Sequence, residues 1–384
     1  MTRVCFVVNP YLPNYGGGAY YIHKFIPYLK EKGIQGFVVT SRVGNLSEQE
    51  TIDDIKIYRY FSNKSSTIWR IGTLFTFMIF ISKKLNQFDI IHFGDGPGDG
   101  YLGILICKLF RKKVVVESVL LGADDGGSIQ KEKFGNIKIK IINHVDLIFT
   151  VSKVIYDSYS NVIKNKQVIK LVPYGINLKK FNVISKSIKK TERQLYGFKD
   201  NSVILIFIGA IVERKGIDFL LKVLSKLLKH GNIYHLLLIG PTYKTGENYK
   251  NELDKLIFEN NLSSHVHFLG EKKNVAEYLN IADIYVSGSY AEGLPIANIE
   301  AMASGLPGVV VDIAPFHDLY PTTEFGFLVE RDENKFSEII TSLINNTKLY
   351  DDMSYNVRQR VENYFNIEKR AELFQFLYTG TNPK

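Results

Sequence analysis

Glu292 and Glu300 are two carboxylates with seven residues between them, in a stretch whose pattern is strand, loop and helix. The apolar run at residues 284–287 is typical of a buried strand end. Pro295 suits the first turn of a helix, where its missing N–H is not needed, and Gly305 fits the left-handed position just past the helix. We therefore expect Glu292 on the loop leaving the strand and Glu300 about two turns along the helix.

The chemistry open to such a pair is the binding of a phosphate and of hydroxyl groups. Loops between strand ends and helix starts are where α/β sheets bind ligands, and the free backbone N–H groups there favour a phosphate. Two carboxylates nearby can accept hydrogen bonds from sugars, one from a ribose and one from a second sugar. The spacing alone would also suit an ordinary strand–loop–helix unit with solvated glutamates.

The residues around the pair are more specific than the spacing. They read Glu-Gly-Leu-Pro from Glu292 and Glu-Ala-Met-Ala-Ser-Gly-Leu-Pro from Glu300. Together they resemble the donor-site signature of the retaining glycosyltransferases of family 4 (glycosyl transferases group 1), which have the GT-B fold. The resemblance implies that Glu292 orients the donor sugar with the backbone of Gly293 and Leu294, while Glu300 holds the ribose hydroxyls.

Arg214 and Lys215 lie in the segment 209–216, which follows an apolar run and opens a helix. Cations are disfavoured at a helix N-terminus unless an anion is present, although a solvated helix start would also contain them. The segment resembles the family pattern Gly-Arg-x-x-x-x-Lys-Gly, whose two basic residues grip the donor diphosphate. Lys215 matches the second basic position, but Ala210 stands at the first. Either Arg214 restores the lost charge, or the site relies on Lys215 and backbone donors.

Gly16, Gly17 and Gly18 follow the first expected strand and precede the first expected helix. Glycines let the backbone approach a ligand closely, although a plain flexible loop has the same composition. Their order is not Gly-x-Gly-x-x-Gly, so a classical dinucleotide site is not supported. In family 4 a glycine-rich loop at this place contacts the donor phosphate and borders the acceptor site.

Three further carboxylates are candidates for contacting the sugar or the acceptor. Glu117 and Asp124 lie where many family members have a histidine near the reacting sugar, and no histidine is present here. Asp124 and its neighbour Asp125 are equally compatible with ordinary loop carboxylates. Asp95 follows a strand and is expected on the acceptor side, whereas His92 is expected to be a packed strand residue. No metal site and no cofactor are expected, because the histidines lack partners at ligand spacing and the family generally does without a divalent ion.

The whole chain predicts an α/β protein of two domains. Its 384 residues exceed one usual domain, and apolar runs alternate with helical patterns throughout, which favours parallel sheets with covered faces. The resemblance implies two Rossmann-like domains facing a central cleft. They would be an acceptor domain (residues 1–177), a donor domain (178–365) and a C-terminal helix (366–384) that returns to the first domain. Tyr174 stands where the family hinge usually has Asn, and the polar stretch 179–200 is interpreted as the interdomain connection.

The net charge of +9 is compatible with nucleic acid, an anionic membrane or anionic small molecules as partners. No nucleic-acid motif accompanies the charge, so solvated lysines or an anionic membrane surface remain. The apolar run at residues 71–81 is too short to span a bilayer, which needs ~20 residues. It is interpreted as a core helix or as a helix in the membrane interface, anchored by Trp69 and Lys83. The two cysteines, Cys5 and Cys107, suit a reducing compartment, so we expect a cytoplasmic or peripheral membrane protein.

The function expected from these observations is that of a retaining glycosyltransferase of hexosyltransferase type. It would move a sugar from a nucleoside-diphosphate sugar to a hydroxyl of a glycan or lipid-linked acceptor, as in bacterial surface polysaccharide biosynthesis. Two alternatives share the fold. One is an inactive partner subunit that binds nucleotide sugar or glycan, which Ala210 and the missing histidine favour. The other is a nucleotide-sugar epimerase, which would act without an acceptor.

Overall fold

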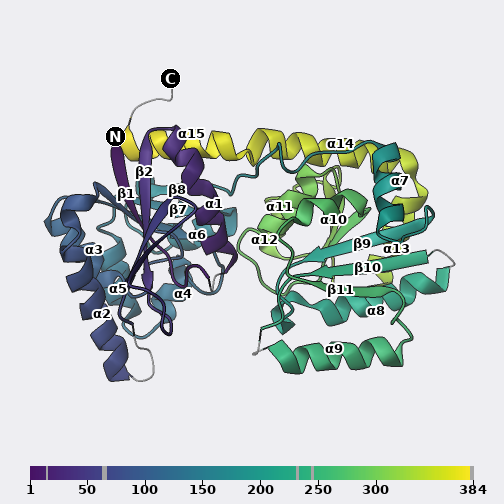
Figure 1. Cartoon of the computed structure of the whole chain (residues 1–384), viewed down its shortest axis with the longest axis horizontal. Coiled ribbons are helices and arrows are strands. Elements are labelled where there is room, and N and C mark those ends of the chain that lie inside the picture. The colour runs from purple at the N-terminus through teal and green to yellow at the C-terminus, as the bar shows by residue number, and fades with distance from the viewer. Residues whose placement is uncertain (14–15, 63–66, 231–232, 244–245, 381–384) are drawn as a thin grey trace. The chain divides into compact units, whose positions relative to one another are not determined.

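The computed structural model describes residues 1–13, 16–62, 67–230, 233–243 and 246–380, with the backbone alone for residues 67–71 and 230. The chain forms two compact units. Unit 1 contains Met1–Gly175 and Ile367–Lys384, and unit 2 contains Ile176–Asn366. Each unit is a parallel sheet covered by helices, as the alternation of apolar runs and helical patterns predicts (Figure 1).

Unit 1 is built on an eight-stranded sheet with the strand order β3-β4-β2-β1-β5-β6-β7-β8. Its neighbours pair in parallel, apart from the antiparallel hairpin of β3 and β4. In sequence the strands are β1 (Thr2–Val7), β2 (Ile34–Ser41), β3 (Gln49–Ile52), β4 (Ile55–Tyr60), β5 (Ile90–Phe93), β6 (Lys113–Ser118), β7 (Leu147–Thr150) and β8 (Ile169–Leu171).

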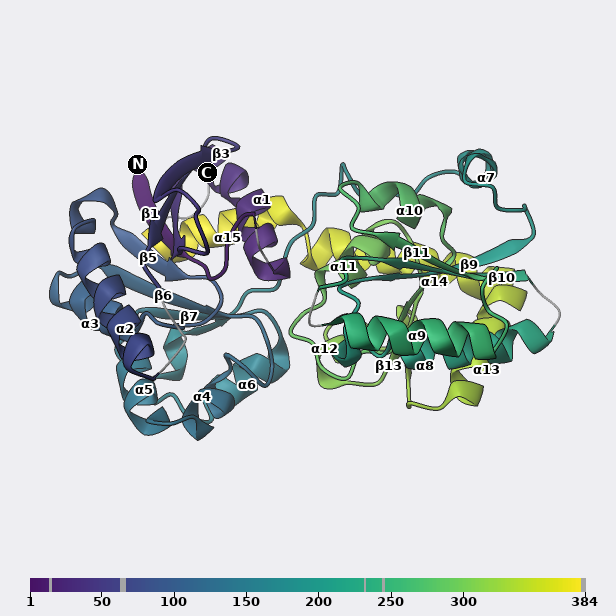
Figure 2. The same ribbon diagram turned by 60° about the horizontal axis from the view of Figure 1, so that its bottom comes forward.

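Helices cover both faces of this sheet. α2 and α3 lie side by side on one face, and α1 and α15 lie side by side on the other (Figures 1 and 2). The helices are α1 (Gly17–Glu31), α2 (Thr67–Ser82), α3 (Tyr101–Leu109), α4 (Gly126–Lys131), α5 (Gly135–Ile142), α6 (Lys153–Ser160) and α15 (Ile367–Thr379). Short 3₁₀ turns occur at η1 (Leu85–Gln87) and η2 (Lys166–Val168).

The C-terminal helix α15 belongs to unit 1, as expected from the family resemblance. Phe374 packs edge-on against Phe25 of α1, with the ring centroids 4.9 Å apart. Arg370 forms a buried ion pair with Glu117 of β6, and Tyr378 is hydrogen-bonded to His92 of β5 at 2.5 Å. The helix is therefore fixed to the sheet by both apolar packing and a buried polar network.

Unit 2 contains a six-stranded sheet with the strand order β11-β10-β9-β12-β13-β14, and every pairing is parallel. The strands are β9 (Ser202–Ile208), β10 (Ile233–Ile239), β11 (Val266–Gly270), β12 (Ile284–Ser287), β13 (Gly308–Val311) and β14 (Gly326–Val329). The near-continuous apolar sequence of the central strand β9 fits burial on both faces.

Helices α8 and α9 lie on one face of this sheet and α10 and α11 on the other (Figures 1 and 2). The helices are α7 (Lys186–Leu195), α8 (Ile217–Leu227), α9 (Glu247–Glu259), α10 (Val275–Ile281), α11 (Ile296–Ala303), α12 (Ala314–His317), α13 (Glu333–Asn345) and α14 (Thr347–Tyr364). Two 3₁₀ turns, η3 (Glu213–Lys215) and η4 (Leu228–His230), flank α8.

The structure corrects several boundaries expected from the sequence. The helical pattern at residues 134–144 predicts a helix, but α5 covers only Gly135–Ile142, and it begins at Gly135 because Phe134 has a left-handed φ of 62°. The polar stretch 179–200, expected as a connection, contains the helix α7, whose Ser185 cap accepts from the Ile188 amide. Helix α6 and strand β14 were not expected at all.

The apolar run at residues 71–81 forms most of α2 and contributes to the core. Phe77 and Ile81 are fully buried, whereas Phe75 and Ile79 on the same helix are about half exposed. The side chains of Trp69 and Ile71 lie outside the described residues. The run is therefore a core helix with a second, exposed apolar face.

Candidate functional site

Two loops at the carboxyl edge of the unit 2 sheet touch through a pair of glycines. Gly216, after β9, has a φ of +60°, and a Cβ there would lie 2.0 Å from the carbonyl oxygen of Gly288, after β12. A Cβ on Gly288 would lie 2.3 Å from the carbonyl oxygen of Gly216. Neither position has room for a side chain, so the two backbones pack directly on each other. This contact brings Lys215 to Glu292.

Lys215, Arg214 and Glu292, which the sequence selected, form one charged cluster. The Lys215 Nζ lies 2.5 Å from Oε1 of Glu292, and Arg214 Nη1 lies 3.5 Å from Oε2. Ser289 donates its hydroxyl to Oε1 of Glu292 at 2.7 Å. Arg214 also donates to the carbonyl of Ala291. The carboxylate is buried, and it balances only one of the two cations, so the cluster keeps a positive charge that suits an anion.

The loop that carries Glu292 is supported by Arg331, which sequence reasoning missed. Its Nη2 donates to the carbonyl of Gly288 at 2.6 Å, and its guanidinium lies 3.7 Å from the ring centroid of Tyr290. Arg331 comes directly after β14 and Glu330, at the same carboxyl edge as the other two loops. The short apolar run of β14 was the signal that could have revealed Arg331, because a strand there places Arg331 at the carboxyl edge of the sheet.

Glu300 lies on α11 as its fifth residue, a little over one turn along the helix rather than the two turns expected. Among the residues that the structure describes, none forms a hydrogen bond with its partly buried carboxyl group. Burial raises the pKa of Glu300 to about 7, although the positive charge of Lys180 opposes the rise. The group is thus partly dehydrated and available to accept hydrogen bonds from a ligand.

Backbone donors surround the start of α11. Pro295 is the residue before the first helical turn, not within it as expected, and Ile296 opens the helix. Within the described part of the chain, the N–H groups of Gly293, Leu294 and Ala297 donate to no other residue. Such amides, with the positive end of the helix dipole behind them, are suited to oxyanions and sugar hydroxyls.

The glycine-rich loop of unit 1 is open at the start of α1. Gly16 is the N-cap residue of α1, and a Cβ added to Gly16 or Gly17 would meet nothing within 4 Å. A Cβ on Gly18 would lie 3.8 Å from the hydroxyl of Tyr174. Tyr15 lies outside the described residues. No steric clash therefore requires a glycine at residue 16 or 17, and their lack of side chains leaves open space at the start of α1.

Glu117 and Asp124 make contacts within the fold. Glu117 is 2% exposed and is held between Arg370 and His92, whose Nε2 is 3.1 Å away. Burial tends to raise the pKa of Glu117, but Arg370 and His92 hold it below its usual value. His92 is accordingly a packed strand residue, as expected.

Asp124 organises its own loop. Its carboxylate accepts from the amides of Val119 and Leu120 at 2.9 and 2.8 Å, while burial raises the pKa of Asp124 to about 6. Asp95 accepts from the amide of Asn9 at 2.9 Å. These carboxylates thus already have partners within unit 1, and they do not form a cluster comparable to the one around Glu292.

Other sites give little signal. In the described part of the chain no group of three or more His, Cys, Asp or Glu side chains is arranged to hold a metal ion. None of its helices combines the length and apolarity needed to cross a membrane. Cys5 and Cys107 are both free and buried.

Two family models match the chain. The model described as glycosyltransferase family 4 matches residues 15–180, and the model described as glycosyl transferases group 1 matches residues 188–360. Together they cover most of both units and confirm the family expected from the motifs.

Relatives of known name are glycosyltransferases. An uncharacterized glycosyltransferase of Haemophilus influenzae is 36% identical over 44% of this chain and 46% of its own length. The UDP-Gal:alpha-D-GlcNAc-diphosphoundecaprenol alpha-1,3-galactosyltransferase of Escherichia coli is 28% identical over 55% of this chain and 54% of its own. The chain thus spans about half the length of these relatives.

A solved structure is similar over the full length. Anabaena Alr3699/HepE in complex with UDP and glucose superposes with a TM-score of 0.82, covering 99% of this chain and 100% of that one at 16% identity. At this identity the likeness shows the fold alone, and it confirms the GT-B architecture.

Proposed function

The chain belongs to glycosyltransferase family 4, and from this membership we propose that it transfers a sugar from a nucleoside-diphosphate sugar to a hydroxyl group, with retention at the anomeric carbon. The observation that carries the proposal is the cluster of Lys215, Arg214 and Glu292, followed by the amides of Gly293 and Leu294, which have no partner among the described residues. Cations and aligned amides are what a departing diphosphate needs.

The leaving group determines the roles of the two cations. Charge builds up on the diphosphate as the glycosidic bond breaks, and Lys215 and Arg214 stabilise it. In the unliganded protein Glu292 forms ion pairs with both Lys215 and Arg214. When the diphosphate binds, it takes over part of the interaction of these two cations with Glu292. Glu292 is then released toward the hydroxyls of the donor sugar, which it orients with the Gly293 and Leu294 amides.

Retention is proposed through reaction on one face of the sugar. A double displacement would need a carboxylate nucleophile beneath the anomeric carbon. Glu292 is engaged by Lys215 and Ser289, and Glu117 is enclosed by Arg370 and His92, which makes either a poor nucleophile. In the same-face scheme the leaving phosphate oxygen accepts the proton of the acceptor hydroxyl.

The donor is proposed to be a UDP-sugar. Support comes from the Escherichia coli relative, which is named as using UDP-Gal, and from the Anabaena protein, which was solved with UDP-glucose. Glu300 supplies the ribose contact, because its carboxyl group has no hydrogen bond of its own among the described residues. The glycines at residues 16–18 lie at the start of α1 and border the acceptor.

The acceptor is proposed to be a lipid-linked glycan in surface polysaccharide synthesis. The Escherichia coli relative is named for a diphosphoundecaprenol acceptor, and a Staphylococcus aureus relative for capsular polysaccharide biosynthesis. Unit 1 also exposes a set of apolar side chains, here called the apolar patch, on α2, α3 and the start of α5, where α3 packs against both α2 and α5. Its members are at least about 40% exposed: Phe75, Ile79, Leu105, Leu109, Phe110, Phe134 and Ile137. A surface of this kind marks a membrane or protein interaction site.

The proposed reaction relies on side-chain cations rather than a metal ion. Lys215 and Arg214 supply the positive charge that a bound divalent ion would otherwise bring to the diphosphate. We expect the transfer rate to be the same with EDTA as with added Mg²⁺ or Mn²⁺. A rate that EDTA abolishes and metal restores would contradict this part of the proposal.

One experiment separates the proposal from its alternatives. The purified protein is incubated with a panel of labelled nucleotide sugars, with and without a lipid-linked acceptor, and both nucleotide and sugar products are followed. A transferase releases nucleotide and labels the acceptor. An epimerase converts the nucleotide sugar without acceptor, and an inactive partner subunit binds a nucleotide sugar without turnover. Either of the last two results would overturn the proposal.

A further inference from the structure

Unit 2 contains a second hollow, at the opposite edge of its sheet from Lys215 and Glu292. It has a volume of about 470 Å³ and is lined by α7, the start of β9, the residue before β12, and α14. Lys215 and Glu292 follow the carboxyl ends of β9 and β12, whereas the hollow opens at their amino ends. The seven residues of β9 separate the two places by roughly 23 Å.

Two cations share one carboxylate in the wall of this hollow. Lys189 Nζ lies 3.1 Å from Oδ1 of Asp283, and Arg193 Nη2 lies 2.5 Å from the same oxygen. The other oxygen of Asp283 accepts from the amide of Ile204 at 2.9 Å. The side chains of both cations are at most 20% exposed. Lys189 also donates to the backbone carbonyl of Ala282, and Arg193 donates to the carbonyls of Ile281 and Ser202. Among the described residues, Asp283 is the one carboxylate that pairs with these two cations, so one buried positive charge is balanced by carbonyl oxygens alone.

The remaining charged residues of the wall do not supply the missing anion. At the rim, Lys186 pairs with Asp351 at 3.0 Å and Lys190 pairs with Asp200 at 2.7 Å. Each of these pairs is neutral in itself. Burial lowers the pKa of Lys189, whereas the carboxylate of Asp283 opposes this shift.

A hydroxyl group in the same wall also lacks a partner. Ser202 is 3% exposed, and its Oγ forms no hydrogen bond with any residue in the described part of the chain. A buried hydroxyl without a partner costs free energy, which a ligand that accepts its hydrogen bond would recover. The excess positive charge of Lys189 and Arg193 and the unpaired hydroxyl of Ser202 would both be satisfied by an oxyanion.

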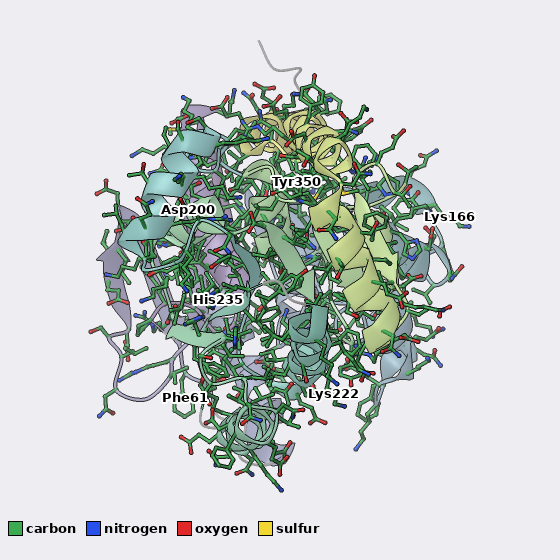
Figure 3. All side chains as sticks on the ribbon, turned by 90° about the vertical axis from the view of Figure 1, so that its right-hand side faces the viewer. Phe61, Lys166, Asp200, Lys222, His235 and Tyr350 are labelled. Carbon is green, nitrogen blue, oxygen red and sulfur yellow. The ribbon has the colours of Figure 1, made fainter. Side chains whose placement is uncertain are left out.

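The size and lining of the hollow suit an anion with an organic body. About 470 Å³ is within the range of small-molecule sites and exceeds what a single oxyanion fills. Leu306, Ile344 and the ring of Tyr350 give part of the wall an apolar surface. Figure 3 looks onto this end of unit 2, with Asp200 labelled near the teal helix α7 and Tyr350 near the yellow-green α14.

We propose that this hollow binds a small phosphomonoester, with the phosphate on Lys189, Arg193 and Ser202 and the organic body toward Tyr350. The ligand would contact both α7, the first helix of unit 2, and α14, its last. The site is independent of the donor site, because it shares no residue with the cluster around Glu292.

The test is isothermal titration calorimetry on the full chain carrying Lys215→Ala, so that the donor-site cation does not add to the signal. The probes are glycerol 3-phosphate, inorganic phosphate and glycerol. Each is titrated into the parent and into three further variants: Lys189→Met, Ser202→Ala and Lys222→Met. Lys222 is exposed on α8 outside the hollow and controls for the loss of one positive charge.

Glycerol 3-phosphate is expected to bind the parent and glycerol is not. Lys189→Met should weaken binding by at least about tenfold and Ser202→Ala by about fivefold, with Lys222→Met within about twofold of the parent. Inorganic phosphate that binds as tightly as the ester would assign the site to free phosphate, the same chemistry from another source. No binding, equal binding of glycerol, or equal losses for Lys189→Met and Lys222→Met would overturn the proposal.

Thermal unfolding without ligand gives a second, independent reading. Lys189→Met leaves Asp283 and Arg193 as a matched pair, so the melting temperature should stay the same or rise. If Lys189 only anchors α7 to the sheet, the variant should instead melt at a lower temperature. A lower melting temperature of Lys189→Met, together with unchanged affinity for glycerol 3-phosphate, would show that Lys189 has a structural role and would contradict the proposed binding site.

Discussion

Lys215 and Arg214 differ in how firmly they are placed, and this predicts unequal roles in the transfer. The Lys215 ammonium is mostly buried and 2.5 Å from Glu292, whereas the Arg214 side chain is 42% exposed and 3.5 Å from the same carboxylate. We expect Lys215→Ala to lower kcat about 10²–10³-fold, the usual loss for one such donor, and Arg214→Ala to lower it less. Steady-state kinetics with the identified donor measures both. A larger loss for Arg214→Ala would mean that Arg214 has taken over the role left open by Ala210.

Glu300 predicts a pH dependence of nucleotide binding. Its pKa is raised to about 7 by burial, so the group is largely protonated at pH 6 and largely ionised at pH 8. The ionised form accepts ribose hydrogen bonds better, so the affinity for UDP should rise across this interval. Glu300→Gln should lose this component, and Glu300→Ala should weaken binding by about 1.5–3 kcal/mol. Calorimetry at both pH values tests the role, and parallel profiles for the parent and Glu300→Gln would exclude it.

The same shift predicts a stability effect of opposite sense. A carboxyl group whose pKa is higher in the folded state stabilises the fold only at low pH, and this advantage is lost as pH rises from about 4.5 to about 7. Glu300→Gln should therefore melt about 2–4 °C above the parent at pH 8, the shift that ~1 kcal/mol gives in a domain of this size, and near it at pH 5. An unchanged difference across this range would contradict the burial of the group.

At the scale of the elements, the contact of Gly216 with Gly288 is what brings together the loops of the proposed donor site. Gly216→Ala would introduce a Cβ 2.0 Å from the Gly288 carbonyl oxygen and force the loops apart. Gly270→Ala, in the same unit, is the matched control, since Gly270 also has a positive φ of +67° but a Cβ there would meet nothing within 4 Å. We expect the free energy of unfolding to fall by ~1 kcal/mol in Gly270→Ala and by clearly more in Gly216→Ala. Denaturant unfolding compares them, and equal losses would show that the contact can relax.

The elements also show what a sequence can and cannot reveal. Strand, loop and helix around Glu292 were predictable, because Pro295 and Gly305 mark where α11 starts and ends, and Gly305 indeed has a φ of +75°. Helix α7 was not, because its buried face is formed by the charged residues Lys189 and Arg193 rather than by an apolar stripe. Arg331 was missed because β14 was not recognised: unlike β12, which is also four residues long, β14 begins with a glycine and its two central residues are only partly buried.

For the molecule as a whole, the alternation of strands and helices and the family motifs predicted the α/β class and the C-terminal helix of unit 1. The acceptor side was less predictable. Glu117 and Asp124 looked like free carboxylates in the sequence, but their contacts come from α15 and from the Asp124 loop itself. Glu117 meets Arg370 across 253 residues of chain, and no local pattern announces such a pairing.

A prediction at the scale of the whole molecule concerns membrane association. Basic residues such as Lys83, Arg111 and Lys133 lie close in sequence to the apolar patch of α2, α3 and α5 on unit 1, and the chain carries a net charge of +9. Each cation near an anionic surface contributes ~1 kcal/mol, and this attraction fades beyond a Debye length. We expect reversible binding to vesicles with anionic lipid, little binding to neutral ones, and release of most of the protein by salt. Sedimentation at low and high salt measures this.

Variants separate the apolar contribution from the charge. Phe75 and Ile79 are 50% and 51% exposed on α2, so changing both to Ser removes patch area while leaving the buried Phe77 in place. The double variant should lose whatever binding survives high salt. Phe258→Ser, at a residue 80% exposed in unit 2, controls for the loss of an exposed apolar side chain elsewhere. If the parent stays bound to vesicles at high salt and the double variant does not, the patch inserts into the bilayer and charge makes the smaller contribution. If anionic vesicles bind none of it at either salt concentration, the patch has a different partner.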